Sequence, residues 1–191
     1  MSILIAGLVV FFGVHAVSIF NEPWRDSMVA KLGEWPWKGM YSMAAIIGFL
    51  LIVWGYGLAR VDPVVLYSPP MWLRHVSLLV LGPVFPLLLA TYLPGRIQVV
   101  TRHPMLIATK LWAVAHLLAN GTLADVLLFG SFLVWAVIDR ISMKHRTQRL
   151  IPGVAPSRFN DTIAVLFGLV LYTGFVLWLL AWLIGVSPTA A

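Results

Sequence analysis

Six long apolar runs constrain the fold of this chain more than any other feature of its sequence. They lie at about residues 3–20, 40–59, 71–93, 105–119, 123–138 and 162–184. A helix that crosses a bilayer needs about 20 predominantly apolar residues, whereas an open strand in lipid would leave its backbone polar groups unpaired. We therefore predict an all-α, polytopic membrane bundle with six transmembrane helices, forming a single transmembrane domain over residues 1–191.

The composition favours lipid over nucleic acid as the main partner of this chain. Hydrophobic residues make up 61% of the sequence and charged residues 10%, whereas soluble domains carry about 25% charged residues. The net charge of +6 comes from basic residues that lie mostly between the apolar runs, so membrane topology explains them without nucleic acid. The absence of cysteine excludes thiolate metal sites and covalent haem attachment.

The distribution of Lys and Arg between the loops predicts the orientation. Loops after the first, third and fifth runs hold ten basic residues, namely Arg25, Lys31, Lys38, Arg96, Arg102, Arg140, Lys144, Arg146, Arg149 and Arg158. The opposite loops hold only Arg60 and Arg74. Because cytoplasmic loops are enriched in Lys and Arg, we expect both termini on the non-cytoplasmic side.

Several local signals predict where helices bend, begin and end. Pro83 and Pro86 lie in the middle of the third run and should kink it, freeing backbone carbonyls that need other donors. Pro104 should open the fourth helix, and Asn120–Gly121 resembles a left-handed stop. Thr122 and Asp125, three residues apart, predict a capping box at the start of the fifth helix.

Two histidines inside apolar runs are the main candidates for a functional site. His15 lies in the first run and His116 in the fourth. An imidazole carries a donor and an acceptor that lipid cannot satisfy, so each ring needs a neighbouring helix, an internal cavity or a metal. Two such rings favour a cofactor, with both as metal ligands. At ~1.5 Å per residue the two differ in depth by roughly 10 Å, which leaves His75 as an alternative partner.

Other ionisable residues near the ends of the runs are secondary candidates. His75, beside Arg74, lies near the outer end of the third run, where an interfacial role is the simpler interpretation. His103 lies at the cytoplasmic mouth of the fourth helix, as a ligand, an acid or base, or a cap. Lys110 lies about two turns inside that helix, so it must snorkel or bind an anion such as Asp139 or a cofactor carboxylate.

Six sequence blocks, in the same order along most of the chain, resemble the NnrU family of bacterial membrane proteins. They are Phe12-Gly13-x-His15, Leu73-Arg74-His75, Tyr92-Leu93-Pro94-Gly95, Thr101-Arg102-His103-Pro104-Met105, the segment from Lys110 to Gly121, and Trp135-Ala136-x-x-Asp139-Arg140. This resemblance implies a multi-pass protein of the bacterial inner membrane. It also implies a link to denitrification, in support of nitrite and nitric oxide reductases.

The NnrU family is related to zeta-carotene isomerase, a membrane enzyme that binds haem b through histidines and isomerises a polyene. That relationship implies non-covalent haem b here, with His15 and His116 at the ligand positions. His75 and His103 are then alternates, and Lys110, Arg74 and Arg102 are candidate partners for the propionates. A cysteine ligand of the plant enzyme falls at Ala113, so a thiolate ligand is not available to this chain.

Three functions remain open at this point. The first is a haem protein with a redox or nitric oxide-related role, or with isomerase-like chemistry on a hydrophobic small molecule. The second is a methyltransferase that uses S-adenosylmethionine, because Arg102-His103-Pro104 resembles the R-H-P-x-Y signature of membrane methyltransferases, although no tyrosine follows. The third is a non-enzymatic assembly factor for a respiratory reductase.

Overall fold

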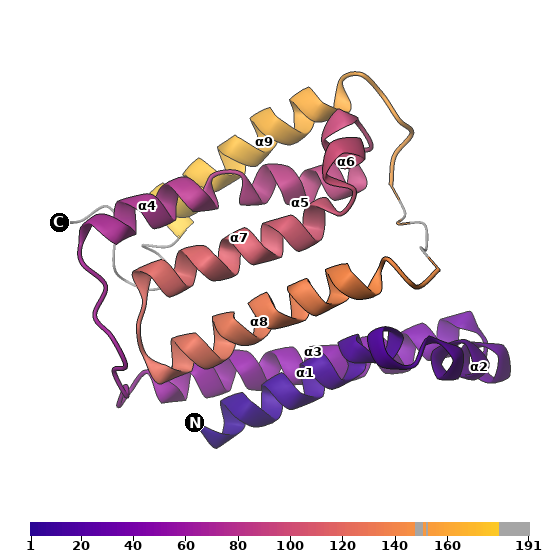
Figure 1. The fold of residues 1–191 in the computed structure, drawn as a ribbon, viewed down its shortest axis with the longest axis horizontal. Helices are drawn as coiled ribbons and strands as arrows, with labels where there is room; N and C mark the ends of the chain where they lie inside the picture. The colour runs from indigo at the N-terminus through magenta and orange to yellow at the C-terminus, as the bar shows by residue number, and fades with distance from the viewer. Residues whose placement is uncertain (148–150, 152, 180–191) are drawn as a thin grey trace. The chain divides into compact units, whose positions relative to one another are not determined.

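The described part of the protein is all-α, as the sequence predicts. The computed structural model describes residues 1–147, 151 and 153–179. Within these residues the elements are α1 (Ser2–Phe20), α2 (Glu22–Leu32), α3 (Glu34–Ala59), α4 (Trp72–Leu81), α5 (Val84–Tyr92), α6 (Arg96–Thr101), α7 (Pro104–Ala119), α8 (Leu123–Ser142), α9 (Asn160–Gly174) and a π-helical turn (Phe175–Leu179). Figure 1 shows the course of the chain through them.

Four helical segments among the described residues are long and apolar enough to cross a membrane. They are Ser2–Phe20, Glu34–Ala59, Trp72–Tyr92 and Asn160–Leu179. Helix α7 has 16 residues, or about 24 Å against a hydrocarbon core of about 30 Å. Helix α8 is longer but carries Asp125, Asp139 and Arg140. The chain is thus a membrane protein by its apolar helices, while the six-span count and the orientation of the termini stay predictions.

The chain divides into two compact units that are described separately. The first unit comprises residues 1–70 and 116–148, and the second comprises residues 71–115 and 149–191. The first contains α1, α2, α3, α8 and the last turn of α7. The second contains α4, α5, α6, most of α7 and α9. Whether they act as one transmembrane domain stays a prediction.

Close packing of α1 on α3 builds the first unit, and the two helices run side by side (Figure 1). Glycines make this approach possible. A Cβ at Gly48 would lie 2.7 Å from the backbone nitrogen of Phe11, and one at Gly7 would lie 2.6 Å from that of Ile52. A Cβ at Gly55 would overlap the backbone of Leu4. Small residues let membrane helices pack backbone to backbone in this way.

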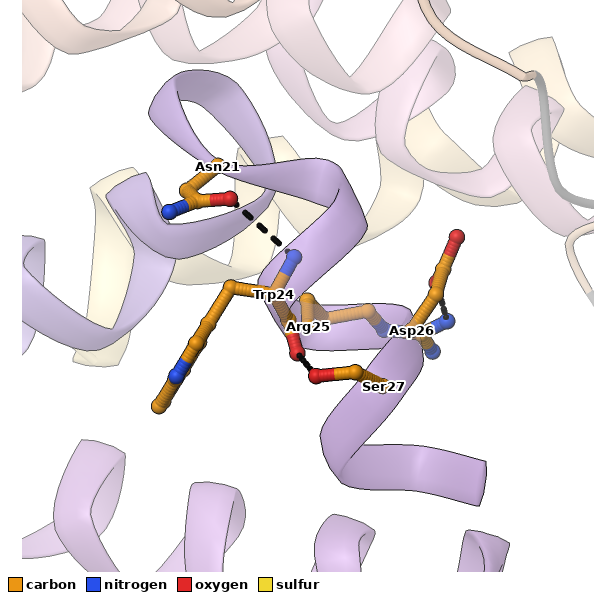
Figure 2. A network of polar contacts seen from close by, with 5 residues as sticks. All are labelled: Asn21, Trp24, Arg25, Asp26 and Ser27. Atoms are coloured by element: carbon orange, nitrogen blue, oxygen red, sulfur yellow. Dashed lines mark hydrogen bonds and ion pairs between the residues drawn. The ribbon is translucent and has the colours of Figure 1, made fainter. Parts of the chain in front are cut away.

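A short polar helix between α1 and α3 was not predicted from the sequence, which left residues 21–39 as a loop. Figure 2 shows how α2 begins: the Asn21 side chain accepts from the Trp24 N–H, and the Ser27 hydroxyl donates to the Trp24 carbonyl. Arg25 pairs with its neighbour Asp26. The helix ends at Gly33, which has a φ of 86°. Its exposed Trp24 and its many charged residues are typical of a helix at a membrane–water interface.

Helix α3 begins six residues before its predicted start at residue 40. Its first turn contains Glu34, which forms an ion pair with Lys38 one turn later at 2.6 Å. Pro36 is tolerated there because the first amide groups of a helix have no partner within the helix. The prediction missed this turn because it followed apolar residues alone, and the turn is polar.

In the second unit, the predicted kink in the third run is confirmed. The helix is interrupted between α4 and α5, where the Gly82 N–H bonds to Leu79 in a tight turn before Pro83. The carbonyl of Leu78 is then free to accept a hydrogen bond from the Tyr172 hydroxyl of α9 at 2.6 Å. Helix α9 packs against α5, with Gly168 placed where a Cβ would lie 2.5 Å from the nitrogen of Pro86.

The predicted helix ends are only partly confirmed. Pro104 opens α7, and Thr122 with Asp125 forms the capping box of α8. The left-handed stop at Asn120–Gly121 is wrong, because Gly33 and Arg102 alone have positive φ among the described residues. Gly121 is required for a different reason: a Cβ there would overlap the carbonyl of Tyr67. The end of the sixth predicted span, from residue 180, lies outside the described residues.

Candidate functional site

His15 lies near the carboxyl end of α1 with its tautomer fixed by the helix itself. Its Nδ1 lies 2.7 Å from the carbonyl oxygen of Phe11, one turn earlier. A carbonyl can only accept, so Nδ1 carries the proton and Nε2 presents its lone pair. Among the described residues no hydrogen bond reaches Nε2. Metal-bound histidines usually have this arrangement, with the second ring nitrogen donating to a carbonyl.

Aromatic rings from three helices surround His15. Its ring stacks on Phe11 at a centroid distance of 4.1 Å and meets Tyr41 of α3 and Trp135 of α8 edge-on, at 5.3 and 5.8 Å. We call His15, Phe11, Tyr41 and Trp135 the His15 cluster. Trp135 Nε1 is the one buried side-chain nitrogen or oxygen in the described chain that has no hydrogen-bond partner. The cluster therefore presents an acceptor, His15 Nε2, and an unpaired donor.

An ion pair joins Asp139, one turn beyond Trp135 on α8, to Arg146, which follows the end of that helix. Arg146 Nη2 contacts Asp139 Oδ1 at 2.6 Å, and the two side chains are 15% and 7% exposed. The Asp139 carboxylate is close enough to act electrostatically on His15. Asp139 is thus bound to Arg146, and the anion partner that the sequence suggests for Lys110 stays a prediction. The pair marks the polar end of the His15 cluster.

His116 lies in the last turn of α7 and is packed differently from His15. Its ring lies parallel to that of Phe129, with a centroid distance of 4.3 Å and an interplanar angle of 4°. The Asp125 carboxylate acts electrostatically on it. We call His116, Phe129, Asp125 and Tyr56 the His116 cluster, since the Tyr56 ring also meets Phe129 edge-on at 6.3 Å.

Asp125 has a tertiary role that the sequence did not reveal. It is 4% exposed, and one carboxylate oxygen accepts from the Thr122 amide and hydroxyl at 2.9 and 2.6 Å. The other oxygen accepts from the Tyr56 hydroxyl of α3 at 2.5 Å. The capping motif indicated only the first of these interactions. Nothing in the sequence indicates Tyr56 as a partner, because it lies 69 residues away.

Leu66 and Tyr67, which precede α4, form hydrogen bonds with the turn at the end of α7 that carries His116. The single proton of the Tyr67 hydroxyl is shared between the carbonyls of Leu117 and Asn120, whose oxygens lie 2.5 and 2.7 Å from the hydroxyl oxygen. The amides of Leu66 and Tyr67 both donate to the Gly121 carbonyl, at 2.8 and 3.1 Å. These bonds satisfy carbonyls that the end of a helix leaves unpaired, and they hold His116 in a defined place.

The two histidines lie in the same unit but contact α8 at different levels. Their ring partners, Trp135 and Phe129, are six residues apart on that helix, which corresponds to about 9 Å along its axis. This separation agrees with the depth offset expected from the sequence. The Nε2 lone pair of His15 is the kind of donor that would hold a haem iron. His116 would have to leave its stacking on Phe129 before it could serve as a second ligand.

The other five predicted site residues belong to the second unit. Arg74 and His75 are exposed in the first turn of α4, as the interfacial interpretation expects. His103 is half-buried just before α7, and Lys110 is half-buried within it. None of the described residues forms a group of three or more histidine, cysteine or acidic side chains that could hold a metal ion. A haem iron, held by one or two imidazoles, needs no such group.

Arg102 has a backbone conformation that favours glycine. Its φ is 61°, and the His103 N–H bonds to the Thr101 carbonyl at 2.7 Å across it, forming a γ-turn with positive φ. Such a turn is strained in a residue with a Cβ. It sets the direction of the chain into α7 at Pro104. An open groove of about 990 Å³ in the same unit is lined by residues 94–100 and 156–162 and includes neither Arg102 nor His103.

Comparison with known proteins agrees with the resemblance in the sequence. The family model described as "NnrU protein" matches residues 3–188. Comparisons with curated proteins and with solved structures gave no match. The matched range includes both histidine clusters and every predicted site residue. The chain therefore belongs to the NnrU family.

Proposed function

We propose that this protein is a membrane haem-b protein in which His15 is an axial ligand of the iron. The observation that carries the proposal is the fixed tautomer of His15. Its Nδ1–H is bound to the Phe11 carbonyl, so Nε2 offers a lone pair inside a mostly apolar cluster. A lone pair in hydrocarbon is costly without a partner, and an iron centre provides one.

The surroundings of His15 suit a large flat ligand better than a bare metal ion. Phe11, Tyr41 and Trp135 present faces or edges of rings at the imidazole, and such surfaces pack well on a planar macrocycle. The described residues supply few oxygen ligands there, since the Asp139 carboxylate is already bound to Arg146. With no cysteine in the chain, a thiolate ligand is excluded, and His15 Nε2 is the donor that this cluster presents.

His116 is the second ligand in this proposal, as the family resemblance implies. To reach the iron it must exchange its stacking on Phe129 for coordination, since the two histidines lie at different levels of α8. Two imidazoles would fill both axial positions and suit electron transfer, whereas one alone would leave a position for a small molecule such as nitric oxide. The resting state of His116 thus decides between these two types of chemistry.

The biological role follows from membership of the NnrU family and is part of the same proposal. Bound haem would supply one-electron chemistry or diatomic-gas binding, in support of nitrite and nitric oxide reduction in the bacterial inner membrane. Isomerase-like chemistry on a hydrophobic polyene is the other role that the family relationship suggests. Either substrate would enter from lipid, which suits an apolar site between α1, α3 and α8.

Absorption spectra of the full chain, purified in detergent, test the proposal. We expect a Soret band and a pyridine haemochrome of haem b in the wild type, both strongly reduced in His15→Ala. We expect His116→Ala to retain haem but to change its axial ligation, with readier binding of carbon monoxide by the reduced protein. His145→Ala is the matched control, because this histidine is exposed after α8.

Two results would contradict the proposal. One is a wild-type protein with no haem after expression with ample haem supply. The other is a His15→Ala variant that is folded and binds haem as the wild type does, in which case His75→Ala and His103→Ala would identify the true ligand. A spectrum of His116→Ala identical to the wild type would remove His116 from the site and leave His15 in it.

A further inference from the structure

The buried, unpaired indole N–H of Trp135 belongs to a ring that contacts the ring of His15. The centroids of the two rings are 5.8 Å apart and the rings are perpendicular, and Trp135 Nε1 is buried without a partner among the described residues. A buried donor that stays unbonded costs about 1–3 kcal/mol. Two complementary unpaired groups, a donor and an acceptor, in one apolar cluster indicate a ligand that binds both.

We propose that Trp135 Nε1–H donates a hydrogen bond to a carboxylate of the porphyrin whose iron is held by His15. This inference rests on the proposed haem function and adds a recognition residue to it. The polar groups on the rim of haem b are its two propionates, so a carboxylate oxygen is the acceptor that such a ligand offers to an indole. A hydrogen bond to a charged group is stronger than one between neutral groups.

The position of Trp135 along α8 favours a carboxylate there. Asp139, one turn beyond it, and Arg146, which pairs with Asp139 from beyond the end of α8, form the polar end of the His15 cluster. An amphiphilic porphyrin in a bilayer turns its carboxylates toward the polar end of a helix and its apolar edge toward the interior. Arg146 uses Nη2 to bind Asp139, and a guanidinium has five N–H groups, so further donors are available at this end.

A variant that loses the indole N–H of Trp135 but keeps an aromatic ring distinguishes hydrogen bonding from packing. Trp135→Phe keeps an aromatic ring against Phe12 and His15 and removes the donor. Trp54→Phe is the matched control, because Trp54 is 60% exposed on α3. Each variant, prepared without haem as the full chain in detergent, is titrated with iron protoporphyrin and with its dimethyl ester, which lacks the carboxylate charge.

We expect Trp135→Phe to bind iron protoporphyrin about tenfold more weakly than the wild type and Trp54→Phe to bind it equally well. The dissociation constants of the wild type and of Trp135→Phe for the dimethyl ester should agree to within about twofold. Circular dichroism checks that the variants are folded, and ultraviolet resonance Raman of the indole N–H should show a stronger hydrogen bond when haem binds to the wild type.

The possible failures are distinguishable. Equal haem affinity of the wild type and Trp135→Phe overturns the role of Trp135 and leaves His15 as a ligand. A tenfold loss that is the same for haem and for the ester overturns the role of a charged carboxylate as the acceptor of the Trp135 N–H. A wild type that binds neither porphyrin overturns this inference together with the proposed function.

Discussion

Arg146 reaches back seven residues to pair with Asp139, with 2.6 Å between Nη2 and Oδ1. Asp139 is in the last full turn of α8, and Arg146 lies beyond the end of that helix. The pair fixes the direction in which the chain leaves α8. It also neutralises a mostly buried carboxylate, Asp139, that acts electrostatically on His15.

Loss of one partner of this pair should destabilise the first unit. Removing one charge of a buried ion pair costs about 3–5 kcal/mol, whereas neutralising both charges can cost little. We expect Arg146→Ala to lower the unfolding midpoint in detergent markedly, and Asp139→Asn with Arg146→Gln to recover most of the loss. Thermal unfolding followed by circular dichroism measures both. A single variant as stable as the wild type would show that the pair contributes no stability.

The glycine contacts between α1 and α3 predict a clear difference between two alanine substitutions on one helix. A Cβ at Gly48 would lie 2.7 Å from the Phe11 nitrogen, whereas Gly57 has no atom within 4 Å. We expect Gly48→Ala to destabilise the protein by about 1–3 kcal/mol and Gly57→Ala to be neutral or stabilising by up to about 1 kcal/mol. Unfolding in a denaturing detergent measures the stability of both variants relative to the wild type. Equal stability would mean that the helices separate easily.

Tyr172 should stabilise the broken helix of the second unit through its hydroxyl. That group donates to the Leu78 carbonyl next to the interruption at Pro83. Tyr172→Phe leaves this carbonyl without its donor, at a cost of about 1–3 kcal/mol. Tyr92→Phe is the control, since the Tyr92 ring is 48% exposed. Hydrogen exchange around residues 78–83 should speed up in Tyr172→Phe only. If hydrogen exchange in Tyr172→Phe is the same as in the wild type, packing alone stabilises the interruption between α4 and α5.

Tyr67 should make the stability of the first unit depend on alkaline pH. Partial burial, and to a smaller extent the Asp125 carboxylate, raise the pKa of the Tyr67 phenol above its ordinary value of 10.0. A group whose pKa is raised by folding stabilises the fold fully below its unfolded pKa, and that contribution is lost as the pH rises through the folded pKa.

The comparison of the wild type with Tyr67→Phe isolates this contribution. We expect the wild type to be the more stable protein at about pH 8 and the difference to shrink as the pH rises above the ordinary phenol pKa of 10.0, because the ionised phenol can no longer donate to the carbonyls of Leu117 and Asn120. Thermal unfolding across this range measures it. A difference that does not change with pH would show that the hydroxyl does not titrate with unfolding.

The sequence predicted the features that depend on local chemistry. Pro83 removes an amide and interrupts the helix, Pro104 opens α7, and Thr122 with Asp125 caps α8. Each effect involves residues within one or two turns of each other, so the signal is contained in a short stretch. The polar helix α2 was missed because a search for apolar runs does not detect a helix with few apolar residues.

The candidate site was predictable only in part, because most of it consists of tertiary contacts. The polarity argument and the family motifs both indicated His15, but its bond to the Phe11 carbonyl depends on the side-chain conformation. The Trp135–His15 ring contact and the Tyr56–Asp125 hydrogen bond join helices far apart in the sequence. No local pattern encodes such pairs. Gly121 was recognised as special but for the wrong reason, since the constraint comes from Tyr67.

The glycine-mediated pairing of α1 with α3 has a consequence for biogenesis. Gly7, Gly48 and Gly55, which permit the close approach, all lie in the first third of the chain. Membrane helices are delivered to the bilayer in order of synthesis, so this hairpin can assemble while the ribosome is still translating α4. His15 therefore enters the membrane before Trp135 has been synthesised. The His15 cluster is completed only when α8 is inserted.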